Sequence, residues 1–292
     1  DWIYIYNHYL LGAGSFGDFV AVDRPYSAWV YSLTMPVFGD RAVYYHLLLL
    51  SLRLSSVFLF WWMLRLVWRG KPRLAFWAAL LFAVYPGFQQ EPIAVQFILH
   101  FVILDLFFLS MVCMLLAVKK TRWRWLLTAG GVFCSMGLFS LEYFAGLEIL
   151  RPALLWMAIA PQDAPAKRRA PRFFLNWLPY LLVLAGFAVW RIFIFQFPTY
   201  QPDVFRGLIQ DPAGTLPALA RRIAGDLKTV VFDAWRQTFR LPESRMELIV
   251  FLALTLAVFI LTLMFLKRLN MMIGWRRTQP GGSGRTGWSR PQ

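Results

Sequence analysis

The chain has 292 residues, of which 59% are hydrophobic, 18% aromatic and only 15% charged. A soluble domain usually carries about 25% charged residues, so this composition excludes an ordinary soluble protein. The net charge of +15 would suit nucleic acid, but the basic residues stand in short clusters between long apolar runs. Such clusters are typical of the loops of a membrane protein. We therefore expect an all-α polytopic membrane protein that has the lipid bilayer as partner and binds no nucleic acid.

Residues 1–42 are too polar to cross a bilayer but rich in Trp and Tyr, which predicts an interfacial outer loop. In this loop Asp23 precedes Arg24 and Pro25, so a potential base stands next to a guanidinium that can hold a phosphate. The alternative interpretation is a solvated loop with a local ion pair. The GAGSFG at 12–17 matches the GxGxxG dinucleotide fingerprint, but no βαβ unit is credible here, so we interpret its glycines as turn-formers.

A helix needs roughly 20 apolar residues to cross a bilayer. The apolar runs that predict about seven transmembrane helices are 43–67, 74–90, 92–118, 123–141, 146–160, 173–197 and 246–266. The run at 146–160 is short, which fits a tilted or partly inserted helix. Clusters of Lys and Arg follow every second run, so these loops are expected in the cytoplasm and the N-terminus outside. Of the fifteen carboxylates, only Asp163 falls in a cytoplasmic loop and only Asp105 in mid-span, and the other thirteen, Glu148 among them, are expected on or near the outer face.

Ionisable residues inside spans are costly and usually face inward. Arg53 and Asp105 lie at similar depths below the outer ends of their spans, which predicts a structural ion pair. Arg191 lies in the outer third of its span, where it either extends to the interface or holds a lipid phosphate. The cysteines Cys113 and Cys134 fall inside apolar runs and are interpreted as small buried hydrophobes.

Two outer turns add further acidic residues. Glu91 stands in YPGFQQEP at 85–92, and Glu142 ends a span in SLEYFAG. Each either faces a substrate or is an ordinary polar turn residue, since Pro at a helix start needs no function.

The segment 198–245 is expected to be an outer loop that contains an amphipathic helix at 215–240, whose role is either to cover the outer site or to anchor the loop. Residues 267–292 are expected to form a cytoplasmic disordered tail. The sequence contains no nucleophile elbow, no zinc motif, no P-loop and no Cys/His metal spacing.

The order of these motifs resembles the bacterial polytopic glycosyltransferases of the GT-C superfamily. The resemblance covers most of residues 1–266, through DWIYIYN, DRPYSAWVYSL, YPGFQQEP and LEYFAGLEILRP. It implies a multi-pass protein of the bacterial inner membrane with its active face outside the cytoplasm. Because family members have a span just before the first outer loop, the chain is expected to be an N-terminally truncated fragment.

The resemblance also implies an activity: inverting transfer of a sugar from a polyprenyl-phosphate donor to an acceptor at the outer face. The family's catalytic carboxylate falls on Asp1, with Asp23 as second choice. Arg24 or Arg191 would stabilise the leaving phosphate, and Glu91 and Glu142 would bind sugar hydroxyls. A divalent metal is possible but not indicated, and oligomeric state is left open. The alternative functions are a non-enzymatic subunit of a membrane assembly and a transporter or flippase of a lipid-linked substrate.

Overall fold

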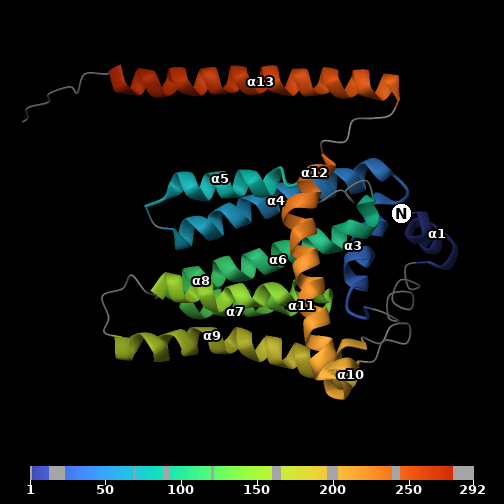
Figure 1. The fold of residues 1–292 in the computed structure, drawn as a ribbon, viewed down its shortest axis with the longest axis vertical. Coiled ribbons are helices and arrows are strands. Elements are labelled where there is room, and N and C mark those ends of the chain that lie inside the picture. The colour runs from blue at the N-terminus through green and yellow to red at the C-terminus, as the bar shows by residue number, and fades with distance from the viewer. Residues whose placement is uncertain are drawn as a thin grey trace, which may run out of the picture. The chain divides into compact units, whose positions relative to one another are not determined.

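The computed structural model is all-helical in the residues that it describes (Figure 1). These are residues 2–12, 24–68, 70–87, 93–119, 122–159, 166–195, 203–238 and 244–278. Within these ranges the chain forms helices and turns and no strand, so the predicted all-α class is confirmed. Four of the helices are long and apolar enough to cross a membrane, which supports a membrane protein.

The chain divides into two compact units, Asp1–Trp235 and Arg236–Gln292. The first unit opens with two short helices, α1 (Trp2–Leu11) and α3 (Ala28–Phe38), inside the segment that we expected to be an outer loop. Its remaining elements are α4 (Ala42–Val67), α5 (Pro72–Ala83), α6 (Ala94–Lys119), α7 (Arg124–Ser135), η1 (Met136–Phe139), η2 (Glu142–Ile149), α8 (Leu150–Ile159), α9 (Ala166–Val189), η3 (Trp190–Ile194), α10 (Asp203–Gln210), α11 (Pro212–Lys228) and η4 (Thr229–Asp233). The boundary between the two units falls inside α12 (Ala234–Gln237). The second unit contains α13 (Arg245–Thr278), which continues past residue 266, where the span was expected to end.

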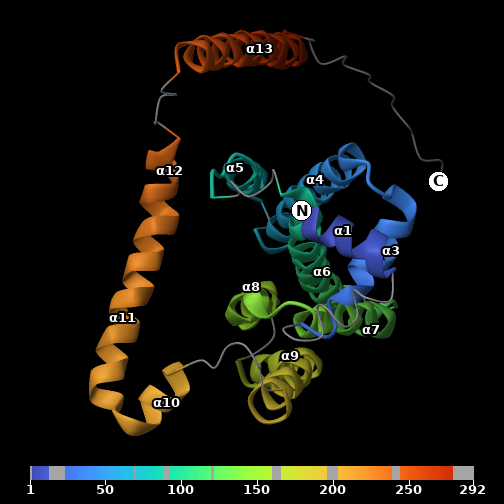
Figure 2. The ribbon, with the colours of Figure 1, turned by 90° about the vertical axis from the view of Figure 1, so that its right-hand side faces the viewer.

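In the first unit, α4 to α9 lie side by side and alternate in direction, with α6 in the middle (Figures 1 and 2). The central helix packs against α4, α7 and α8, and further pairs form between α4 and α5 and between α8 and α9. A helix that is apolar on all sides is stable when it is buried on all sides. This explains the position of α6, whose sequence carries one acidic residue, Asp105, between Ala94 and Val118.

The four long helices are Ala42–Val67, Ala94–Lys119, Arg169–Ile194 and Arg245–Phe265. The other three predicted spans contain shorter helices. The helix α5 has 12 residues, and α7 and η1 together cover Arg124–Phe139. The run at 146–160 begins as a 3-10 helix and continues as α8, which has 10 residues. A 12-residue α-helix rises about 18 Å, less than the roughly 30 Å of a bilayer core.

The predicted pair of Arg53 with Asp105 is wrong, because the structure gives each side chain another partner. Arg53 donates to the carbonyls of Phe82 and Ala83 at the C-terminus of α5, at 3.4 and 3.0 Å. Asp105 instead hydrogen-bonds with Ser56 of α4. The last carbonyls of a helix have no partner within it and attract cations, so the end of α5 binds the guanidinium. The sequence could not show this, because it does not show that α5 stops at Ala83.

Basic side chains satisfy other helix ends in the same way. Lys119 donates to the carbonyl of Leu66 near the end of α4, and Arg172 donates to the carbonyl of Val118 near the end of α6. Lys119 and Arg172 belong to two of the basic clusters from which we predicted the orientation in the membrane, so these clusters also cap helices. We call this end of the bundle, with Arg65, Lys71, Lys119 and Arg124, the basic end.

A fully buried ion pair links η2 to α8. The Arg151 side chain is 0% exposed and binds the Glu148 carboxylate through both Nε and one terminal nitrogen, at 2.5 and 2.6 Å. It also donates to Ser110 of α6 at 3.1 Å, and its guanidinium lies over the Tyr180 ring at 4.3 Å. Glu148 was expected at the outer face, but the structure buries it at this junction of α6, α8 and α9.

Next to this network α6 and α7 approach closely at Gly131. A Cβ atom there would lie 2.5 Å from the Tyr180 hydroxyl and 3.1 Å from Cβ of Cys113. We therefore expect Gly131→Ala to lower the free energy of unfolding by about 1–3 kcal/mol, as overpacking does in other cores. The measurement is titration with denaturing detergent in mixed micelles.

The neighbouring residue provides a matched control for this prediction. A Cβ at Gly130 meets nothing within 4 Å, and alanine favours a helix by up to about 1 kcal/mol over glycine. Gly130→Ala should therefore leave stability unchanged or raise it. Equal losses from the two substitutions would contradict a close approach at Gly131.

Candidate functional site

Three of the six predicted site residues belong to the described part of the chain: Arg24, Glu142 and Arg191. The other three, Asp1, Asp23 and Glu91, lie outside the described residues. Because α7 and α9 both begin at the basic end, Glu142 after α7 and Arg191 after α9 lie at the opposite end, and the structure brings Arg24 into contact with Glu142.

Arg24 lies just before α3 and reaches the first residues of η2, although 118 positions separate Arg24 from Glu142 in the chain. Its terminal nitrogen lies 3.6 Å from Oε1 of Glu142 and donates to the Tyr143 hydroxyl at 2.9 Å. The guanidinium carbon lies 5.0 Å from the centre of the Tyr143 ring. The same ring packs against His100 of α6, with ring centres 5.5 Å apart. We call these four residues the Arg24 cluster.

The electrostatics of the Arg24 cluster keep its cation charged. Partial burial lowers the pKa of Arg24, but the negative charge of Glu142 and the contacts with Tyr143 raise it, and the net direction is upward. The side chains of Arg24 and Glu142 are 29% and 30% exposed, so a ligand can still reach them. The Nε of Arg24 is buried and has no hydrogen-bond partner among the described residues. The Arg24 cluster therefore contains a guanidinium whose charge Glu142 balances, with one nitrogen that has no hydrogen-bond partner among the described residues.

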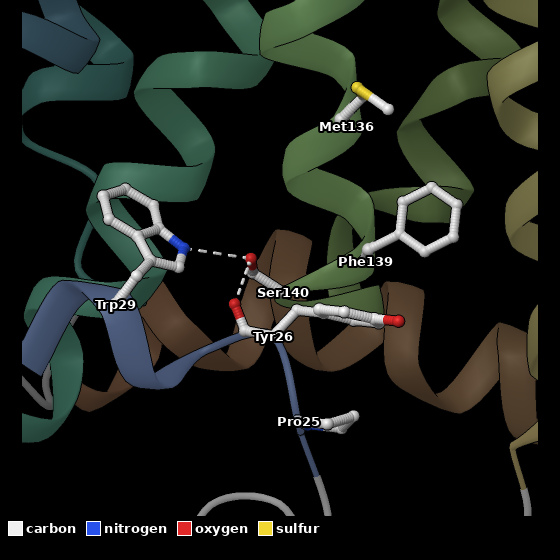
Figure 3. Close-up of a pocket in the computed structure, with 6 residues that line it drawn as sticks. All are labelled: Pro25, Tyr26, Trp29, Met136, Phe139 and Ser140. Atoms are coloured by element: carbon white, nitrogen blue, oxygen red, sulfur yellow. Dashed lines mark hydrogen bonds between the residues drawn. The ribbon is translucent and has the colours of Figure 1, made fainter. Parts of the chain in front are cut away.

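An aromatic pocket of about 570 Å³ adjoins the Arg24 cluster (Figure 3). It is lined by Pro25, Tyr26, Trp29, Met136, Phe139 and Ser140. Ser140 stands between two of its neighbours: its hydroxyl donates to the Tyr26 carbonyl at 2.6 Å and accepts from Nε1 of Trp29 at 3.2 Å. Pockets of 300–1,000 Å³ with apolar walls and a few fixed polar groups are typical of small-molecule sites.

Apart from His100 of α6, the pocket and the Arg24 cluster are built from the same two chain segments. Residues 24–29 enter α3, and residues 136–143 run from η1 into η2. The bonds from Ser140 to Trp29 and to Tyr26 hold these segments together. A ligand in the pocket would therefore have aromatic surface on its apolar part and a guanidinium near its rim.

Arg191 lies in η3, at the C-terminal end of α9. It donates to the carbonyl of Phe195 at 3.4 Å, and the charge of Glu142 acts on it as well as on Arg24. Its neighbour Trp190 packs on Tyr26 and Phe139, with ring centres 5.4 and 5.6 Å apart. Arg191 therefore belongs to the same end as the pocket, but the lining of the pocket does not include it.

Sequence reasoning missed the residues that shape this site. Tyr26, Trp29, Phe139 and Tyr143 were not selected individually, because 18% of the chain is aromatic and no spacing distinguishes them, and Ser140 carried no signal of its own. The buried pair of Glu148 and Arg151 did carry a signal, since residues three apart share a helix face. Among the described residues, no group of three or more His, Cys, Asp or Glu side chains could hold a metal ion.

Comparison of the chain with protein-family models, with curated proteins and with solved structures finds no significant match.

Proposed function

We propose that this chain is an integral-membrane glycosyltransferase that moves a sugar from a polyprenyl-phosphate donor to an acceptor at the outer membrane face. The observation that carries the proposal is the position of Arg24: a guanidinium held by Glu142 and Tyr143, on the residue that precedes Pro25 in the lining of an aromatic pocket. Such a donor combines an anionic phosphate with a sugar and an apolar chain. Guanidinium groups bind phosphate through charge-assisted hydrogen bonds, and aromatic rings offer apolar surface with polar edges.

The proposed topology has seven crossings, with the basic end in the cytoplasm of a bacterium and the pocket outside. It is supported by two features: each of the seven predicted runs contains a described helix, and α4 to α9 alternate in direction. Lys and Arg concentrate in cytoplasmic loops, which favours this orientation of the basic end. Three crossings would then combine a short helix with flanking 3-10 or non-helical residues.

In the proposed reaction a carboxylate removes the proton from an acceptor hydroxyl as its oxygen attacks the anomeric carbon. The bond from this carbon to the phosphate oxygen breaks, and its electron pair leaves with polyprenyl phosphate. Arg24 would stabilise the negative charge that develops on that oxygen. Asp23 precedes Arg24 in the chain, and Asp1 is the position that the family resemblance favours. Glu142 would hold Arg24 in place, with Glu91 and Arg191 as further substrate contacts.

The test is release of polyprenyl phosphate by the reconstituted chain from a panel of polyprenyl-phosphate sugars. We expect Asp23→Asn or Asp1→Asn to reduce release by about 10²–10⁴-fold, the usual contribution of a general base. Asp40→Asn is the matched control, because Asp40 lies at the same end of the bundle but lines a different cavity.

Each other outcome has a definite meaning. Release that is equal in wild type, Asp1→Asn and Asp23→Asn would remove both residues as the base. If no donor supports release, the chain is not this enzyme, and a non-catalytic subunit or a carrier of lipid-linked substrates becomes the better explanation.

A further inference from the structure

We propose that the segment from α11 to α12 lies flat on the bilayer surface, with an apolar stripe in the hydrocarbon and its basic flank on the headgroups of anionic phospholipids. The inference does not depend on the proposed glycosyl transfer. It resolves the two roles that the sequence leaves open for this segment, covering the site or anchoring the loop.

The segment is one continuous helical stretch with a defined start. The Asp211 carboxylate accepts a hydrogen bond from the backbone of Gly214 at 3.0 Å, and Pro212 occupies the first turn. Both features favour the beginning of a helix. From there α11, η4 and α12 follow without a break as far as Gln237.

The direction of this helix distinguishes it from the bundle. Figure 2 looks along α6 and α9 but shows α11 over its full length, so α11 runs across the bundle helices. If the bundle helices cross a membrane, every turn of α11 lies at a similar depth. That is the geometry of an interfacial helix.

The helix is attached to the bundle near its C-terminal end. The Tyr85 hydroxyl, just after α5, donates to the Val230 carbonyl at 2.8 Å, and its ring lies 6.2 Å from that of Trp235. Among the described elements, α11 packs mainly against α10 and η4. Its turns before Val230 therefore have little protein to cover them.

An apolar stripe runs along these turns. Leu216, Ile223 and Leu227 recur at spacings of seven and four and are 56%, 51% and 59% exposed. Residues at such spacings share one face of a helix. In water this face would remain uncovered, and a single amphipathic helix owes most of its stability to burial of that face. The hydrocarbon edge of the bilayer to which the neighbouring helices belong would cover it.

The other side of the helix carries the charge that selects the lipid. Arg221, Arg222 and Lys228 lie away from the apolar stripe, and basic residues outnumber acidic ones between Pro212 and Gln237. Amphipathic helices with a basic polar face bind anionic lipids through both apolar burial and electrostatic attraction. We therefore infer that this helix binds an anionic phospholipid bilayer. It neither prefers a neutral bilayer nor packs over the candidate site.

The experiment places a fluorescent label on each side of α11 in the full chain, with Cys113 and Cys134 replaced by alanine. Ile223→Cys reports the apolar stripe. Gly225→Cys is the matched control, because it lies on the opposite face, removes no charge and has open space for a Cβ. The chain is reconstituted in vesicles that contain phosphatidylglycerol and nitroxide-labelled acyl chains, and nitroxide quenching is compared with quenching by aqueous iodide.

We expect nitroxide quenching several-fold stronger at position 223 than at position 225, the reverse order with iodide, and a weaker difference in purely zwitterionic vesicles. Equal nitroxide quenching at both positions would overturn the proposal. Position 223 protected from both quenchers would show that protein covers the stripe, which also contradicts it. If the difference in nitroxide quenching between positions 223 and 225 is the same in anionic and in zwitterionic vesicles, the proposed preference for anionic lipid is refuted.

Discussion

Replacing Arg24 by glutamine will reduce kcat for sugar transfer by about 10²–10³-fold, the usual effect of removing one group that stabilises developing negative charge. Glutamine keeps hydrogen-bonding capacity but loses the charge that Glu142 and Tyr143 hold in place. Glu142 would then have no cation at 3.6 Å. The measurement is the rate of polyprenyl phosphate release at saturating donor, together with KM.

Arg41 provides a matched control for this prediction. It also bonds to a tyrosine hydroxyl, Tyr44 at 3.3 Å, and also lies over that ring, but it lines neither the aromatic pocket nor the Arg24 cluster. Arg41→Gln should leave kcat unchanged, and Arg24→Lys should recover part of it. If Arg24→Gln keeps the wild-type kcat, then sugar transfer does not take place at the aromatic pocket with Arg24 as the stabilising group, whatever the other variants show.

Replacing Arg151 by methionine will cost about 3–5 kcal/mol of unfolding free energy, because it leaves the Glu148 carboxylate buried without its cation. The pair is enclosed: the Arg151 side chain is 0% exposed and the Glu148 side chain 4% exposed. The same change removes the donor to Ser110 and the cation over the Tyr180 ring. Detergent titration of the purified chain measures the loss.

Two further variants separate the charge effect from the packing effect. Replacing both partners, as Glu148→Leu with Arg151→Met, should recover most of the loss, since an apolar pair is often as stable as a buried ion pair. Arg122→Met, at an exposed position beside Trp123, should change stability by less than about 0.5 kcal/mol. If the double variant is no more stable than Arg151→Met, then lost packing and not an unpaired charge explains the result.

Part of the site was predictable from the chain. Glu142 was selected as a carboxylate at the outer end of a span and Arg24 as a phosphate-binding guanidinium beside Asp23 in the outer loop, and the alternation of spans and basic clusters requires no tertiary information. Their contact was not predictable, because it depends on how the residues before α3 fold back onto η2. The aromatic pocket was not predictable either, since its lining comes from two segments more than a hundred residues apart.

The sequence alone determined the class of the protein: its apolar runs and scarce charge require helices in a membrane, because backbone polar groups in a bilayer must bond within the segment. It could not say how deeply each helix is buried, since hydropathy measures composition and not contact. The spans of α4 and α9 have nearly equal mean hydropathies of 1.9 and 1.8, yet the structure buries 33% of one and 11% of the other. Likewise, only the tertiary structure showed that Arg53 binds the end of α5 while Asp105 binds Ser56. The physical reason is that a buried charge takes the nearest unsatisfied partner, and which group is nearest depends on where neighbouring helices end.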